Sequence, residues 1–173
     1  EAIDEGADGG WEAWGEPARG RVDGRRLEGR RLHISEATDT VTAAGRVLAE
    51  EADRQIVTDS IVVLRDSDEV DAYGDVGVTA ADVEGRLQAQ RLRSADEGEH
   101  LLLWGDASLE RQRTTGDALS LRADTLRLDG EEKLLTGVGD FRLASPPGVE
   151  LRAGRGAYPT AGDSAALTGE VEF

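Results

Sequence analysis

Apolar residues alternate with polar ones along most of the chain, around a glycine that returns about every thirty residues. This repeat glycine is followed by a polar residue and then by an apolar or small one, at Gly15, Gly45, Gly74, Gly105, Gly139 and Gly169. Apolar residues occupy the second and fourth positions after it, as Val76 and Val78 do after Gly74. A period of two predicts β-strands with one buried face.

A second element, the hexad, lies between successive glycines and consists of an aliphatic residue, a small residue two positions later and an aliphatic residue at position six. Its copies span residues 27–32, 56–61, 87–92 and 121–126, with a degenerate copy at 151–156. Every copy ends 13 residues before the next glycine, whereas the distance from glycine to hexad varies from 11 to 16 residues. Turn formers such as Asp129-Gly130 follow each hexad. Each repeat therefore predicts a hairpin of constant size, with variable connections at the opposite end.

The alternation of buried and exposed positions shifts by one residue inside the hexad, because positions 1 and 3 lie on one face of a strand and position 6 lies on the other. A β-bulge within the hexad would return all three to the interior, and the mid-strand glycine fits a bend. No segment shows a helical period. We therefore expect an all-β fold, an elongated twisted β-jellyroll or solenoid-like stack of about five and a half two-stranded repeats.

We expect residues 1–173 to form a single domain in which residues 1–13 are an irregular N-terminal segment. The ends of such a stack carry unpaired edge strands, which favours head-to-tail self-association. The net charge is −16, from 36 Asp and Glu against 20 Lys and Arg, and this opposes a nucleic acid partner. High-salt adaptation and GC-rich coding both remain open as explanations of the acidity and of the single lysine, Lys133.

The absence of cysteine excludes disulfides and thiolate metal sites. There is no run of 18 apolar residues, and the first ten residues lack the regions of a signal peptide, so we expect a chain that is either cytosolic or already trimmed.

The repeats resemble those of the LptA/OstA-like family of bacterial lipopolysaccharide-transport proteins, which includes LptA, LptC and the periplasmic domain of LptD. The resemblance covers residues 14–173 and is clearest where the hexad at 87–92 leads to Trp104, Gly105 and Asp106. It implies a β-jellyroll that holds the acyl chains of lipopolysaccharide between its sheets, a periplasmic location, and protomers joined edge to edge with other Lpt-type proteins. Whether the role is LptA-like or LptC-like stays open.

On this hypothesis, inward residues of the central repeats contact lipid, although an ordinary protein core is the preferred interpretation of any single one of them. They are Val76, Val78, Leu87, Leu101, Leu103, Leu109, Leu121, Leu126, Phe141 and Leu143. Each methylene of lipid buried there would contribute roughly 0.8 kcal/mol. The arginines in and beside the hexads could meet phosphate, but cross-strand pairing with carboxylates is the preferred interpretation. These arginines are Arg30, Arg31, Arg91, Arg93, Arg122 and Arg127.

Candidate catalytic and cofactor sites are not supported by the sequence. His33 and His100 occupy unrelated repeat positions, and the acidic segment 66–69 with Asp71 lacks the glycine and closing glutamate of a calcium loop. No recurring column of outward carboxylates is expected. Trp14, Tyr73 and Trp104 share one repeat position, which favours a structural column over a sugar platform.

We therefore expect no enzyme activity, no catalytic or metal residues and no cofactor. The alternative to a lipid carrier is a ligand-free structural β-solenoid that self-assembles in the cell envelope.

Overall fold

A computed structural model describes residues 2–5, 10–51, 54–81, 83–112, 118–145, 148–160 and 164–172. Its strands are β1 (Ala2–Glu5), β2 (Trp11–Val22), β3 (Arg25–Ser35), β4 (Thr40–Glu51), β5 (Arg54–Leu64), β6 (Glu69–Ala80), β7 (Val83–Ala95), β8 (His100–Gln112), β9 (Ala118–Asp129), β10 (Leu134–Ser145), β11 (Val149–Pro159) and β12 (Ala166–Thr168). A short 3₁₀ helix, η1 (Asp96–Gly98), lies in one turn. The prediction of an all-β fold is confirmed.

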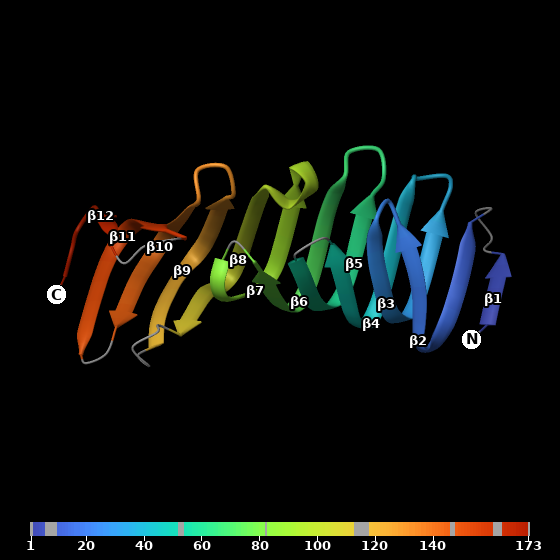
Figure 1. The fold of residues 1–173 in the computed structure, drawn as a ribbon, viewed down its shortest axis with the longest axis horizontal. Coiled ribbons are helices and arrows are strands. Elements are labelled where there is room, and N and C mark those ends of the chain that lie inside the picture. The colour runs from blue at the N-terminus through green and yellow to red at the C-terminus, as the bar shows by residue number, and fades with distance from the viewer. Residues whose placement is uncertain are drawn as a thin grey trace.

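The strands form a single elongated sheet in which sequence neighbours are also spatial neighbours, from β1 at one end to β12 at the other (Figure 1). Every pair of neighbouring strands is antiparallel. Antiparallel neighbours need only short connections, so the chain adds strands one after another along the long axis. The result is an open stack with an edge strand at each end of its described part.

The two sequence elements occupy alternate strands. The hexads lie in β3, β5, β7, β9 and β11, and the repeat glycines from Gly15 to Gly139 lie in β2, β4, β6, β8 and β10. Four-residue turns follow the hexad strands at 36–39, 65–68, 96–99 and 130–133, and Figure 1 shows them along its upper edge. The connections at the other ends range from two residues after β2 to five after β8. The constant hairpin and the variable opposite margin are both confirmed.

The strands bend at the repeat glycines, as predicted, but the bulge is not in the hexad. Gly74 and Asp75 both have positive φ, at 76° and 40°, and the other glycine pairs from Gly45 to Gly139 do the same. Between Tyr73 and Val76 the register shifts against both neighbouring strands, with the extra residue on the glycine strand β6. Glycine tolerates this backbone without a Cβ penalty, which is why the extra residue falls there.

The expectation that residues 1–13 are irregular is wrong for the residues that the structure describes. Residues 2–5 form β1, which pairs with β2 through Ala2 opposite Trp14 and Glu5 opposite Trp11. Too few apolar residues lie in this segment to produce a strand pattern. The exposed backbone of β2 supplies the hydrogen-bond partners instead, because an edge strand accepts another strand whatever its side chains are.

Candidate functional site: an apolar interior closed by arginines

One face of the sheet carries apolar side chains that line up from strand to strand. Val78 lies opposite Leu87, Leu87 opposite Leu109, Leu109 opposite Leu121 and Leu121 opposite Leu143. The same column continues through Ile56 and Ala49 to Leu27 on one side and to Leu151 on the other. With about 4.8 Å between strands, these nine positions, from β3 to β11, span roughly 38 Å.

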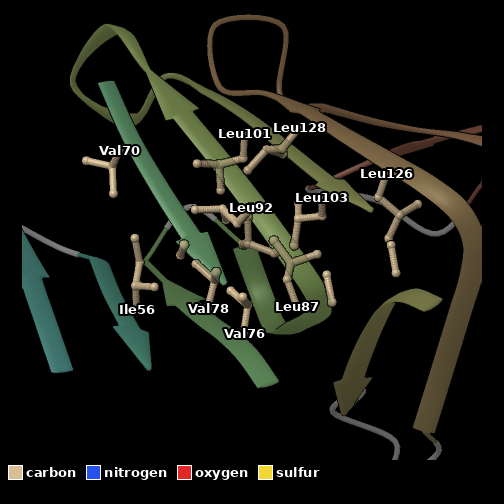
Figure 2. Packing of buried hydrophobic residues seen from close by; sticks show 14 of the residues in the cluster. Ile56, Val70, Val76, Val78, Leu87, Leu92, Leu101, Leu103, Leu126 and Leu128 are labelled. Atoms are coloured by element: carbon tan, nitrogen blue, oxygen red, sulfur yellow. The ribbon is translucent and has the colours of Figure 1, made fainter. Parts of the chain in front are cut away.

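A second pair of apolar columns comes from the other half of each bent strand. One contains Ile61, Leu92, Leu103 and Leu126. The other contains Val70, Leu101, Leu128 and Leu135, with the buried Ser94 between Val70 and Leu101. All three columns belong to one buried cluster, and Figure 2 shows its central members converging between the strands. Hexad positions 1 and 6 point to opposite sides of a flat strand, so the bend is what brings both into this interior.

The ten residues predicted to face inward all do so. Nine of them are no more than 2% exposed, and Leu143 is 7% exposed. Leu109 is buried whereas its neighbour Glu110 is exposed, as the predicted alternation requires. The structure therefore brings the ten together in one interior, and their contact with lipid remains a proposal.

The interior is closed along one side by a nearly buried arginine. Arg25, at the start of β3, has a side chain only 4% exposed and donates hydrogen bonds to Asp68 in the β5–β6 turn. Its second terminal nitrogen lies 2.9 Å from Glu51 Oε1. Burial by itself lowers the pKa of Arg25, but hydrogen bonds and charge interactions with Asp68 and Glu51 outweigh burial and raise that pKa. The guanidinium is therefore charged inside the fold.

Further contacts of the same kind join the margin of variable connections to the margin of constant turns. Arg65 Nε lies 3.7 Å from Asp23 Oδ2, Arg54 donates to the Gly98 carbonyl, and Arg111 Nη1 donates to Tyr158 Oη at 3.2 Å. We call the line formed by Arg25–Asp68, Asp23–Arg65, Arg54–Gly98 and Arg111–Tyr158 the seam. Its four contacts each join residues 42 to 47 positions apart in the chain, so the sheet is folded over on itself.

The interior next to the seam is tightly packed. The cavity that Arg25 and Arg54 line with Ile56, Ile61 and Val70 has a volume of about 10 Å³, close to that of a single water probe. An acyl chain would not fit into this space. A ligand could enter here only if the seam opened and the side chains moved apart.

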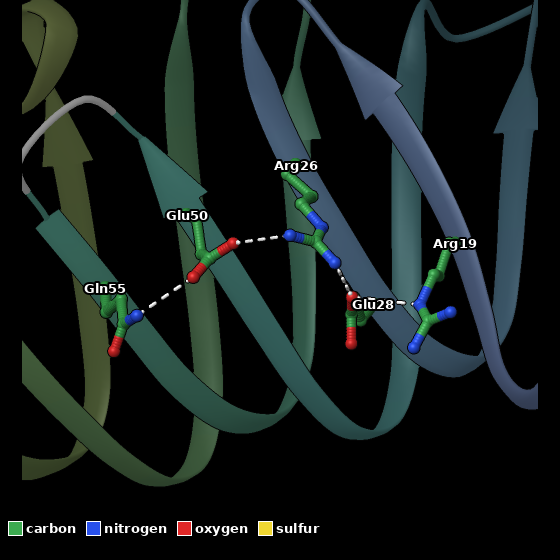
Figure 3. A network of polar contacts seen from close by, with 5 residues as sticks. All are labelled: Arg19, Arg26, Glu28, Glu50 and Gln55. Carbon is green, nitrogen blue, oxygen red and sulfur yellow. Dashed lines mark hydrogen bonds and ion pairs between the residues drawn. The ribbon is translucent and has the colours of Figure 1, made fainter.

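The arginines in and beside the hexads lie on the outer surface, away from the interior. All six are exposed, and two pair with carboxylates on neighbouring strands: Arg31 with Glu12, and Arg93 with Asp71 at 2.8 Å. The same kind of ladder crosses β2 to β5, where Arg19, Glu28, Arg26, Glu50 and Gln55 are linked in series (Figure 3). Cross-strand pairing is thus the observed role of Arg31 and Arg93.

The expectation that no column of outward carboxylates exists is wrong. Asp75, Asp106 and Asp140 occupy the position after the repeat glycine on alternate strands, and together with Asp124 they line an outer groove. The recurring Gly-Asp pair was the sequence signal for this column. A hydrogen bond from Arg142 lowers the pKa of Asp140, so this carboxyl is ionised at neutral pH and is a poor general acid.

Within the described ranges, no three side chains of His, Asp or Glu come together as a metal site. Likewise, none of the helices in the described part of the chain is long and apolar enough to cross a bilayer. Asp68 and Asp71, from the acidic segment considered for calcium, are instead partners of Arg25 and Arg93.

The seam arginines are functional candidates that the sequence analysis missed. Arg25 and Arg54 both lie two residues before a hexad, so their shared position was a detectable signal. That position alone does not indicate a buried arginine, because nothing in the local sequence shows that a strand end will be folded against a distant turn.

No protein-family model matches the chain, and no curated protein matches it in sequence. Among solved structures, that of LptH from Pseudomonas aeruginosa is similar, and LptH is described as the LptA-homologous periplasmic component of the conserved lipopolysaccharide transport device. The identity is 9% and the TM-score 0.44, with 84% of this chain and 82% of that one covered.

Proposed function

We propose that this protein is a periplasmic lipid-binding component of lipopolysaccharide transport, which shelters acyl chains in its interior and bridges to other proteins of the same fold. The observation that carries the proposal is the uninterrupted apolar column from Leu27 to Leu151, because it crosses nine strands without a charged residue. Stacked repeats bury such a column as their ordinary core, and the same continuous apolar surface is what an acyl chain would need along the long axis. The resemblance of the repeats to LptA/OstA-like proteins points to the same class of ligand.

Lipid would enter through the seam. The apolar residues are closed off from water in this conformation, so an acyl chain gains contact with Val78, Leu109 or Leu121 only after the margins separate. Each methylene then transferred from water contributes roughly 0.8 kcal/mol, which offsets the loss of core packing and of the seam contacts. The net charge of −16 repels a phosphorylated lipid at long range, and salt screens that repulsion.

Photo-crosslinking tests the proposal at two neighbouring positions. A benzoylphenylalanine at Leu109 faces the interior, and the same group at Glu110 faces water and is the matched control. We expect purified lipopolysaccharide, offered in high salt, to be captured at Leu109 and not at Glu110. Capture at neither position, in proteins whose circular dichroism shows an intact fold, would reject lipid carriage.

The tight packing of the interior favours a second candidate, a ligand-free β-solenoid that assembles through its edges. Leu103, Leu121 and Leu126 are fully buried, as in an ordinary core. On this alternative, the protein forms ordered filaments that contain no lipid, and electron microscopy together with lipid extraction of the assembled material would identify it.

A further inference from the structure

The outer face of the sheet carries a column that combines aromatic and arginine side chains. From β2 to β12 it contains Trp14, Arg31, Ala44, Ser60, Tyr73, Arg91, Trp104, Thr125, Val138, Arg155 and Thr168, each paired with the next across adjacent strands. We call it the aromatic column. It contains no carboxylate, although the chain has 36. With about 4.8 Å between strands, it is roughly 48 Å long.

Two rings of the aromatic column, those of Trp14 and Tyr73, are exposed, and that of Trp104 is half-buried. Trp14 and Tyr73 are 38% and 37% exposed, and Val138 is 50% exposed. These surfaces face outward on a fold whose interior lies on the other side of the sheet. The half-buried position of Trp104 is also compatible with the structural role predicted for the three aromatic residues.

The centre of the column is organised as a platform. Tyr73, Arg91 and Trp104 are direct cross-strand neighbours on β6, β7 and β8. The guanidinium carbon of Arg91 lies 5.8 Å from the centroid of the Tyr73 ring, within cation–π distance. The two aromatic residues are two strands apart, about 10 Å, with the arginine between them. Arg91 thus lies over one face of Tyr73, and the array offers the remaining aromatic surface and a positive charge to the same ligand.

The charge of the column makes it selective. Among the described residues, Arg91 and Arg155 form no ion pair with a carboxylate, so their charges are available to an anion. At the bend beside the column, Asp75, Asp106 and Asp140 line a groove together with Arg86, Arg122 and Arg142, and Asp140 pairs with Arg142. The carboxylates of Asp75 and Asp106 lie close to the column, so a broad anionic surface such as a membrane meets more negative charge there than a narrow linear anion does.

We propose that the aromatic column binds a linear polysaccharide that carries anionic groups. The apolar C–H faces of sugar rings pack on Tyr73 and Trp104, while Arg91 and Arg155 bind the carboxylates or phosphates of the chain. The sheet separates this surface from the interior, so the ligand is a polysaccharide that is not attached to a lipid held inside. The proposal is independent of lipid transport.

Binding of polygalacturonate to the full chain, with its neutral methyl ester as the comparison, tests the proposal by calorimetry. We expect Trp104→Ala and Arg91→Gln each to weaken polygalacturonate binding by about tenfold, the loss typical of a central interface residue. Trp11→Ala is the matched control, because Trp11 is 51% exposed on β2 but lies outside the column. Melting temperatures of all variants confirm that the fold is retained.

Four results would overturn the proposal: no binding of polygalacturonate, equal loss in Trp11→Ala, equal binding of the methyl ester, or equal binding of polyglutamate, which has the charge without the sugar. Binding of anionic phospholipid vesicles through Trp104 would replace it with a membrane surface. Lipopolysaccharide captured at Leu109 should leave polygalacturonate affinity unchanged, and competition between the two would contradict the independence of the surfaces.

Discussion

The ring of Phe141 occupies the space that a side chain on Gly156 would need. A Cβ added to Gly156 would lie 2.3 Å from ring atoms of Phe141, and one added to Gly137 would lie 2.4 Å from the same ring. Gly156 is the last position of the degenerate hexad, where the other four copies have Leu or Ile. Phe141 stands where other repeats have a valine, and its larger ring fits because Gly137 and Gly156 have no side chains. The degenerate hexad therefore compensates for the larger residue.

This compensation predicts a rescue. Gly156→Leu alone should destabilise the protein by about 2 kcal/mol or more, because overpacking a filled core forces side chains and backbone apart. Phe141→Val alone should cost a similar amount through the cavity that it leaves. The double variant recreates the combination of valine and leucine that an earlier repeat has at the equivalent positions, Val76 and Leu92. It should lose clearly less stability than the sum of the two single losses. Urea unfolding measures the cycle, and strict additivity would show that the two sites do not share space.

The bend glycine Gly74 should be far less replaceable than Gly154. Gly74 has a φ of 76°, and a Cβ there would lie 2.4 Å from the carboxylate of Asp59. We expect Gly74→Ala to cost about 1–2 kcal/mol, from the left-handed backbone alone. Gly154→Ala is the control, because nothing lies within 4 Å of its Cβ position, and it should be neutral or slightly stabilising. Equal effects in thermal unfolding would mean that the bend is not strained.

Arg25 should contribute more to stability than its neighbour Arg26. The Arg25 side chain is 4% exposed and holds Glu51 and Asp68, whereas that of Arg26 is 52% exposed and pairs on the outer face. We expect Arg25→Ala to cost about 2 kcal/mol, since it leaves two carboxylates unpaired at the seam. Arg26→Ala should cost less than about 1 kcal/mol. Denaturant unfolding measures the free energy lost in each variant. Equal losses would mean that Arg25 stabilises the fold no more than the surface residue Arg26 does.

Closing the seam covalently should block lipid capture. The chain contains no cysteine, so Asp23→Cys with Arg65→Cys can be joined by a short bis-maleimide across the seam. We expect capture of lipopolysaccharide at Leu109 to fall at least about tenfold. This corresponds to an increase of roughly 1.4 kcal/mol or more in the free energy of opening the seam.

Asp39→Cys with Arg65→Cys is the matched control, because these residues pair on the same margin and their link leaves the seam free. Undiminished capture by the protein cross-linked across the seam would show that lipid enters elsewhere, for instance from an end of the stack.

The ion pair at the bend should have a distinct pH dependence. The hydrogen bond from Arg142 holds the pKa of Asp140 below its ordinary value of 3.8. A depressed pKa means that the pair stabilises the fold above pH 3.8 and that this contribution is lost as the pH falls through the folded-state pKa.

We expect Asp140→Asn to lower the melting temperature slightly at pH 7 and to have no effect in stronger acid. Asparagine also tolerates the left-handed backbone of Asp140, so the substitution isolates the charge. The carboxyl resonance of Asp140, followed by NMR, should titrate below 3.8, and Arg142→Gln should return it toward that value. An Asp140 midpoint unaffected by Arg142→Gln would contradict the pairing.

The sequence by itself determined the repeating strands, the constant hairpin and the inward positions of residues such as Leu109 and Phe141. These follow from alternation and from turn formers, which act over a few residues. Tertiary structure alone decided which strand carries the bulge, that residues 2–5 pair with β2, that Phe141 fills the place of a hexad side chain, and that Arg25 meets Asp68. Such contacts depend on how far a long sheet bends and twists, and this curvature accumulates over many strands. The curvature of the sheet therefore cannot be predicted from a local pattern of apolar residues.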